Sequence, residues 1–231
     1  MKKILILKAG SSFPELKTQK GDFEDWIVAA SGKSSKHFKV LPIDQINSLH
    51  LDQKPFAAVL ITGSHDNITD NPPYLQNTYT LLKKLREQMV PILGICFGHQ
   101  LLAAAFGGRV TNLKKGTEFG AVKIKKTSQA QNDRLFAFLP QEFWAFMSHQ
   151  QTVQKLPPKA ITLASSPMDQ NAAFYLEPNI WGVQFHPEFD QQIMAFYLKH
   201  HFNISDKEAK SLLLPCPQAS AVIPQFLEKV L

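Results

Sequence analysis

Cys96 stands where the sequence pattern expects a nucleophile. It is flanked by Gly94 and Gly98 within VPILGICFGHQLLAAAFGG at residues 90–108. The pattern predicts a strand, a sharp turn and a helix with the thiol at the apex, because flanking glycines allow strained dihedrals and close packing. Unpaired N–H groups at a helix N-terminus favour thiolate over thiol and can hold an oxyanion. On this segment alone, a small buried apolar role for Cys96 stays an equal alternative.

A histidine and a carboxylate follow a later apolar run, in FHPE at residues 185–188. Residues two apart in an extended segment point to the same side, so His186 and Glu188 can face one site. Pro187 lacks a backbone donor and suits a strand end. A thiol, a histidine and a carboxylate are the nucleophile, general base and orienting group of cysteine and serine hydrolases.

The elements expected to position these groups alternate between strands and helices. Strands are predicted at residues 3–7, 38–43, 56–62, 90–96 and 180–185, and helices at 22–30, 74–88, 100–106 and 193–202. Further strands are predicted at 109–114, 120–126, 142–147, 161–165 and 172–176, the first three of them antiparallel, and residues 148–151 as a loop. These elements predict an α/β fold: an open, mostly parallel sheet flanked by helices, with an added antiparallel section. We expect a single domain over residues 1–231 with a tail of one or two short helices from about residue 203.

Composition excludes several classes of function. The formal charge of +6 comes from scattered lysines with little aromatic interleaving, which favours solvated faces over a nucleic-acid site. Cys96 and Cys216 make neither a disulfide framework nor a metal-ligand pair. No apolar stretch reaches the roughly 18–20 residues that span a bilayer, and residues 1–7 are predicted to be a buried strand rather than a signal segment. We therefore expect a cytoplasmic protein with no cofactor, no metal, no nucleic acid and no membrane.

Several motifs together resemble a known family. GICFGHQ at residues 94–100 and FHPE at 185–188 are similar to class I glutamine amidotransferases, whose flavodoxin-like glutaminase fold carries a Cys-His-Glu triad. GDFEDW, ITGS, FGGRV and SH, at residues 21–26, 61–64, 106–110 and 148–149, fall in the family's order. The resemblance extends to about residue 202 and is closest to free-standing members related to the glutaminase part of GMP synthase.

The resemblance implies a role for each reacting group. Cys96 would attack the side-chain amide carbon of glutamine, His186 would move protons, and Glu188 would fix the imidazole. A thioester would form, and water would release glutamate. The backbone N–H groups of Gly63 and Phe97 would make the oxyanion hole, in which a donor is worth roughly 3 kcal/mol of barrier.

The resemblance also implies where the substrate's α-amino and α-carboxylate groups are held, namely by Gln100 and the pair Ser148 and His149. One position departs from the family: close relatives carry an Asp where this chain has Gln151. A neutral amide attracts an ammonium far less than a carboxylate does. Either another acid, one near Asp66, takes its place, or the natural substrate is not free glutamine.

Three functions follow as hypotheses. The first is a glutaminase that passes ammonia to a separate synthase subunit, since no synthase domain follows the triad. The second keeps the triad and hydrolyses γ-glutamyl peptides or conjugates. The third is a regulatory or binding subunit without activity, against which the intact triad argues. The sequence does not reveal the ammonia acceptor or the oligomeric state.

Overall fold

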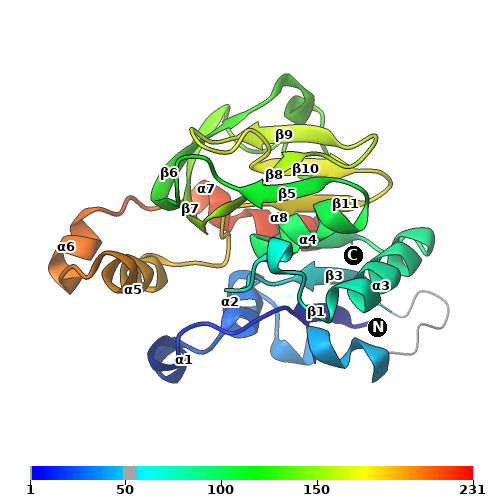
Figure 1. Ribbon diagram of the computed structural model, residues 1–231, viewed down its shortest axis with the longest axis horizontal. Helices are drawn as coiled ribbons and strands as arrows, with labels where there is room; N and C mark the ends of the chain where they lie inside the picture. Colours follow the sequence, from blue (N-terminus) through cyan, green and yellow to red (C-terminus); the bar gives the residue numbers. More distant parts are fainter. Residues whose placement is uncertain (1, 49–55, 231) are drawn as a thin grey trace.

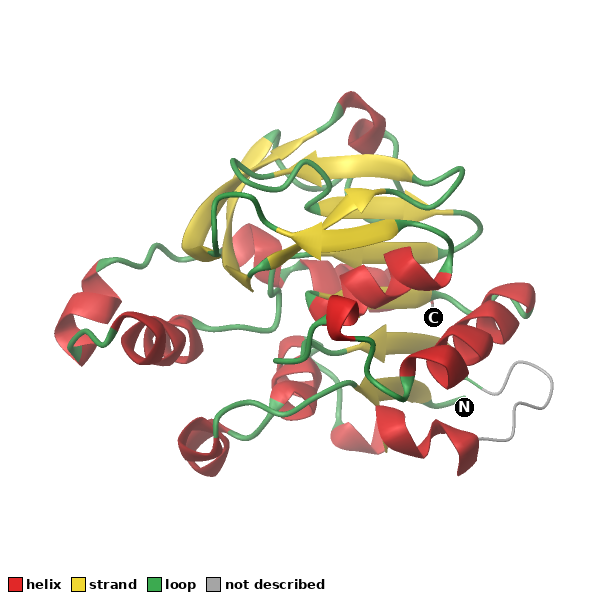
Figure 2. Cartoon of the chain, in the orientation of Figure 1, coloured by secondary structure: helices red, strands yellow, loops and turns green. Residues whose placement is uncertain are grey.

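The computed structural model describes residues 2–48 and 56–230 (Figure 1). Within those ranges the central feature is a nine-stranded sheet with the strand order β2-β1-β3-β4-β11-β10-β9-β6-β7. A separate two-stranded sheet pairs β5 with β8. Figure 2 shows most of the antiparallel strands in the upper part of the view, while further strands lie lower, among the helices.

The half of the sheet from β2 to β11 is parallel throughout. Its strands are β2 (Phe38–Pro42), β1 (Ile4–Lys8), β3 (Ala58–Ile61), β4 (Ile92–Ile95) and β11 (Ile180–Val183). Both faces are covered, so side chains alternate between two cores: Ile4 and Ile6 enter one, and Leu5 and Leu7 the other. Near-continuous apolar runs are typical of such strands, which is why the sequence predicted them.

The other half of the sheet is antiparallel, as are β5 and β8. Its strands are β10 (Ala173–Leu176), β9 (Ile161–Ser165), β6 (Glu118–Lys126) and β7 (Glu142–His149), and the small sheet joins β5 (Arg109–Asn112) to β8 (Gln151–Lys155). The prediction of a mostly parallel sheet with an added antiparallel section is therefore confirmed.

Helices cover the two faces of the sheet. They are α1 (Pro14–Lys20), α2 (Phe23–Ala30), α3 (Leu75–Glu87), α4 (Phe97–Ala105), α5 (Gln191–Phe202), α6 (Asp206–Ser211), α7 (Pro217–Ser220) and α8 (Val222–Val230), with short 3₁₀ turns η1 (Ser35–His37), η2 (Ile43–Ser48), η3 (Ile68–Asp70) and η4 (Ser128–Gln131). One core takes apolar side chains from α2, α5 and α8, and the other takes them from α3 and α4. The helices α5 and α6 stand out from the body at the left of Figure 1.

Four local predictions need correction. Helix α1 was not expected; Pro14, at its first position, is pre-set for a helix start. Helix α4 begins at Phe97 rather than residue 100, because Cys96 alone makes the reversal. Residues 148 and 149 belong to β7, since that strand stays paired with β6 as far as His149, and residue 151 opens β8. The described tail after residue 203 holds three helices rather than one or two.

Among the residues that the structure describes, no helix is long and apolar enough to cross a membrane.

Candidate active site

Cys96 occupies a strained turn between β4 and α4. Its φ of 51° and ψ of −104° lie outside the regions that non-glycine residues ordinarily adopt. Such a conformation costs on the order of 1–3 kcal/mol and persists only where the surroundings impose it. The surroundings do so here, since the residues of α4 from Phe97 to Ala103 are buried against the sheet.

The flanking glycines are required by close packing. A β-carbon on Gly94 would collide with the carbonyl of Gly98. A β-carbon on Gly98 would lie 2.7 Å from the carbonyl oxygen of Ile61, on the neighbouring strand β3. The sequence therefore predicted the elbow correctly, and the reason is the distance between α4 and the sheet.

His186 and Glu188 lie beside this turn, beyond the end of β11. His186 Nδ1 is 2.8 Å from Glu188 Oε1, and the two residues are only 3% and 5% exposed. The sulfur of Cys96 is close enough to the imidazole to act on it electrostatically. The strand ends at Val183, so a turn, and not the extended alternation expected from the sequence, brings the two side chains together.

The electrostatics of the site favour a charged imidazole. Burial alone would lower the pKa of His186, but the carboxylate of Glu188 and the sulfur of Cys96 outweigh burial and raise it. The ring is held in place by Phe189, whose ring stacks on it with 4.0 Å between centroids. An arrangement of this kind can pair a nucleophile with a proton carrier that a third group orients.

Two backbone segments flank the thiol where an oxyanion would form. Phe97 is the first residue of α4, and the N–H groups of a first helical turn have no partner within the helix. Gly63 lies against the imidazole, since a β-carbon there would be 3.1 Å from Cε1 of His186. A cavity of about 200 Å³ lies over Cys96, with Phe97 and Ser64 in its lining. The roles predicted for the N–H groups of Gly63 and Phe97 stay predictions.

The three residues predicted to bind substrate all line this cavity, and they are joined to one another. The side-chain nitrogen of Gln100 donates to the carbonyl of Gln151 at 3.1 Å and to Gln184 Oε1 at 3.0 Å. Nδ1 of His149 donates to the same Gln151 carbonyl at 2.8 Å. The Ser148 carbonyl accepts from the thiol of Cys96 over 3.8 Å. The turn between β7 and β8 is thus tied to the elbow helix.

The sequence analysis missed Glu118, which anchors this turn. Its Oε2 lies 3.1 Å from Nε2 of His149, within hydrogen-bond distance, and the two side chains are 4% and 1% exposed. Ser166 Oγ donates to the same oxygen at 2.6 Å, and the N–H of Met168 donates to Oε1 at 3.2 Å. The role of Glu118 could not be predicted from the sequence, because its partner His149 is 31 positions away on another strand.

The side-chain amide of Gln151 forms its hydrogen bonds within the protein and is not free to bind a ligand. Its Oε1 accepts from the N–H of Ile68 at 3.0 Å, and its Nε2 donates to Thr69 at 2.6 Å and Asn112 at 2.8 Å. It therefore fixes η3 over the cavity. The nearby acid Asp66 lines the cavity, and the hydroxyl of Tyr74 donates to its Oδ2 at 2.6 Å.

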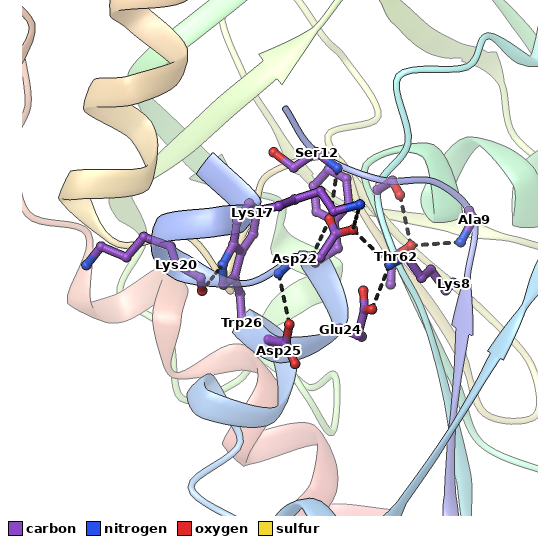
Figure 3. Close-up of polar contacts among 12 residues, drawn as sticks. Lys8, Ala9, Ser12, Lys17, Lys20, Asp22, Glu24, Asp25, Trp26 and Thr62 are labelled. Atoms are coloured by element: carbon purple, nitrogen blue, oxygen red, sulfur yellow. Dashed lines mark hydrogen bonds and ion pairs between the residues drawn. The ribbon is translucent and has the colours of Figure 1, made fainter. Parts of the chain in front are cut away.

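A second layer of polar contacts fixes the loop that follows β1. Figure 3 shows Lys8, Ser12 and Asp22 meeting at the start of α2. Burial would raise the pKa of Asp22, but hydrogen bonds from Lys8 and from the N–H groups of Ser12 and Phe23 lower it to about 2. The hydroxyls of Ser12 and Tyr197 lie 2.9 Å apart, which ties this loop to α5 beside the cavity.

The described residues contain no group of three or more His, Cys, Asp or Glu side chains placed to hold a metal ion.

Comparison with known proteins identifies the family. Residues 19–203 match the family model described as "Glutamine amidotransferase class-I". The chain is 38% identical over 151 residues to one subunit of the glutamine-hydrolyzing GMP synthase of Pyrococcus furiosus, which covers 64% of this chain and 71% of that protein. It is 33% identical over 190 residues to the GMP synthase of Caldicellulosiruptor saccharolyticus. These residues make up 80% of this chain but only 35% of that protein. It is 30% identical over 145 residues to gamma-glutamyl peptidase 4 of Arabidopsis thaliana, 62% of this chain and 58% of that protein.

The fold is also that of a solved structure. A glutamine amidotransferase from Thermotoga maritima superposes with a TM-score of 0.77 at 21% identity, over 100% of this chain and 98% of that one. The chain spans only 35% of the Caldicellulosiruptor GMP synthase, so that protein's whole activity is not carried over. The matched residues, the sheet and the elbow agree, and the chain belongs to the class I glutamine amidotransferase family.

Proposed function

We propose that this protein is an amidohydrolase that cleaves the side-chain amide of glutamine with Cys96 as nucleophile. The observation that carries the proposal is the contact of Cys96, on its strained elbow, with His186, which Glu188 holds at 2.8 Å. A thiol needs such a neighbour because the thiolate is the reactive form.

The geometry supports a two-step reaction. The Cys96 sulfur attacks the amide carbon, and the N–H groups of Phe97 and Gly63 stabilise the oxyanion, each worth roughly 3 kcal/mol of barrier. His186 gives a proton to the departing nitrogen, the carbon–nitrogen bond breaks, and ammonia leaves a γ-glutamyl thioester. His186 then takes a proton from water, which attacks the thioester and releases glutamate.

The contacts around the cavity support an assignment of the substrate's α-end. The nitrogen of Gln100 is used within the protein, which leaves its Oε1 as the group to accept from the α-ammonium. Asp66 supplies the negative charge that the amide of Gln151 lacks. Ser148 and His149, on the same turn, present backbone groups to the α-carboxylate.

We also propose that a separate synthase subunit consumes the ammonia. Support comes from the relative in Pyrococcus furiosus, whose name marks it as one component of a GMP synthase.

Purified protein assayed for ammonia and glutamate with glutamine as substrate tests the proposal. Cys96→Ala is expected to abolish turnover. Cys216→Ala is the matched control, because this other buried cysteine lies just before α7 and has no contact with the cavity. Full turnover by Cys96→Ala would refute the proposal, as would the absence of turnover with and without a synthase partner.

Hydrolysis of γ-glutamyl amides other than glutamine is the second candidate function. The cavity reaches past Cys96 as far as Phe119, His200 and His201, which is more room than an ammonia leaving group needs. The Arabidopsis relative is named a gamma-glutamyl peptidase. The ratio of kcat/KM for γ-glutamyl peptides to that for glutamine decides between the candidates.

A further inference from the structure

The cavity over Cys96 has two halves of different chemistry. The polar half consists of Asp66, Asn67, Gln100, Ser148, Gln150 and Gln151. The aromatic half consists of Phe13, His65, Phe119, Tyr197, His200 and His201. A γ-glutamyl group carries an ammonium and a carboxylate and matches the polar half. The aromatic half offers no acid to hold an ammonium, and its rings remain without a role in glutamine hydrolysis.

The aromatic half is assembled from four separate segments. Phe13 follows β1, His65 follows β3, Phe119 lies in β6, and the rest belong to α5. The ring centroids of Phe13 and His200 are 4.0 Å apart, and those of Phe13 and Tyr197 are 5.1 Å apart. Phe119 stacks on His201 at 4.6 Å with 9° between the rings. Two groups of packed rings, one around Phe13 and one around Phe119, therefore line the same cavity.

Two rings of this half lie close to the reacting groups, because His65 is within electrostatic reach of His186 and Tyr197 is within electrostatic reach of Cys96. The proton donor to the leaving nitrogen must be within hydrogen-bond reach of it, so the leaving amine sits next to His186. His186 stacks on Phe189, and the ring of Phe189 is 5.1 Å from that of Tyr197. Through the ring of Phe189, which is buried and does not line the cavity, the proton donor is thus connected to Tyr197 of the aromatic half.

We propose that the aromatic half is a leaving-group subsite, and that the preferred substrates are γ-glutamyl amides of alkyl amines that carry an aromatic ring. The inference rests on the proposed function. Cys96 attacks the γ-carbonyl, the carbon–nitrogen bond breaks, and His186 protonates the departing amine. Water then cleaves the thioester to glutamate. The ring of the amine packs between Phe13 and Phe119, where offset and edge-to-face contacts are favourable.

Two matched amides test the subsite. γ-Glutamyl benzylamide and γ-glutamyl cyclohexylmethylamide have the same carbon skeleton and differ in the aromaticity of the ring. Kinetics of glutamate release are expected to give a kcat/KM at least about threefold higher for the benzylamide, the size expected of one aromatic pair. Glutamine is assayed alongside.

Variants separate recognition by the subsite from intrinsic reactivity. Phe119→Leu keeps an apolar side chain but removes the ring, and is expected to bring the benzyl to cyclohexyl ratio down to about 1. Phe13→Leu tests the opposite wall in the same way. Phe138→Leu is the control, because this exposed ring lies outside the cavity, and should leave the ratio unchanged. Circular dichroism checks that each variant is folded.

A ratio of threefold or more that falls in Phe119→Leu or Phe13→Leu supports the subsite. A smaller ratio, or one that neither variant changes, overturns it. Hydrolysis of glutamine with neither amide accepted overturns the subsite and leaves the proposed function standing. No hydrolysis of any of the three substrates overturns both.

Discussion

The substitution Glu118→Gln tests how the substrate-facing turn is held. The carboxylate of Glu118 accepts from His149, Ser166 and Met168, and the side chains of the Glu118–His149 pair are 4% and 1% exposed. A glutamine has the same shape, but one of its two terminal atoms is a donor. That donor would face at least one of the three donors that the carboxylate now satisfies.

The expected cost follows from burial. Leaving a buried hydrogen-bond donor without its acceptor costs roughly 1–3 kcal/mol, against about 0.2–1 kcal/mol for an exposed ion pair. Glu142→Gln is the matched control, because Glu142 pairs with Lys123 at 3.4 Å while the two side chains are 48% and 53% exposed. For a chain of this size, these energies correspond to a fall in melting temperature of roughly 2–12 °C for Glu118→Gln and less than about 4 °C for the control.

Thermal unfolding followed by circular dichroism measures both variants, and initial rates with substrate follow. Because the turn from Ser148 to Gln151 loses its anchor, Glu118→Gln is expected to raise KM as well as to lower the melting temperature. Equal melting shifts in Glu118→Gln and Glu142→Gln would refute the reasoning that burial makes the Glu118 contact strong. An unchanged KM would show that the anchor does not position the substrate.

Three further predictions concern the elbow, the loop after β1 and the polar half of the cavity. Gly98→Ala places a β-carbon 2.7 Å from the Ile61 carbonyl oxygen, and is expected to destabilise the protein by about 1–3 kcal/mol in urea unfolding, although alanine is the better helix former. A gain in stability would contradict the packing argument. The pKa of Asp22 is lowered to about 2, so its ionised form stabilises the fold above the unfolded value near 3.9, and this contribution is lost as pH falls through 2. Asp22→Asn should therefore be less stable than the parent at pH 6, with a smaller difference at pH 2; a constant difference would count against the contacts assigned to the carboxylate. Asp66→Asn should raise KM for glutamine about tenfold with kcat little changed, while the exposed Asp44→Asn should leave KM unchanged; equal KM values in the two variants would remove Asp66 from the site.

The grouping of Cys96, His186 and Glu188 was predictable because their signals are local. Gly94 and Gly98 indicate the close approach of α4 to the sheet. His186 and Glu188 are only two residues apart, so their pairing can be read from one short segment. The parallel strands were predictable from their runs of apolar residues, because both faces of a parallel sheet are covered. The chemistry of this site is thus encoded within short segments.

The supporting contacts were not predictable, because they join segments that are distant in the sequence. Glu118 reaches His149 only because β6 and β7 pair in register, with these two residues opposite each other. The sequence suggested that Gln151 alters the substrate pocket, but its side-chain amide forms hydrogen bonds with residues of η3. The aromatic half draws on four segments, and no periodicity connects Phe13 with His200.

Mass spectrometry of the acid-quenched enzyme during turnover tests the role of Cys96 most directly. We predict that the protein gains the mass of one γ-glutamyl group, that the group maps to the peptide containing Cys96, and that Cys96→Ala shows neither the adduct nor turnover. Turnover by Cys96→Ala, or an adduct on any other residue, would contradict the account.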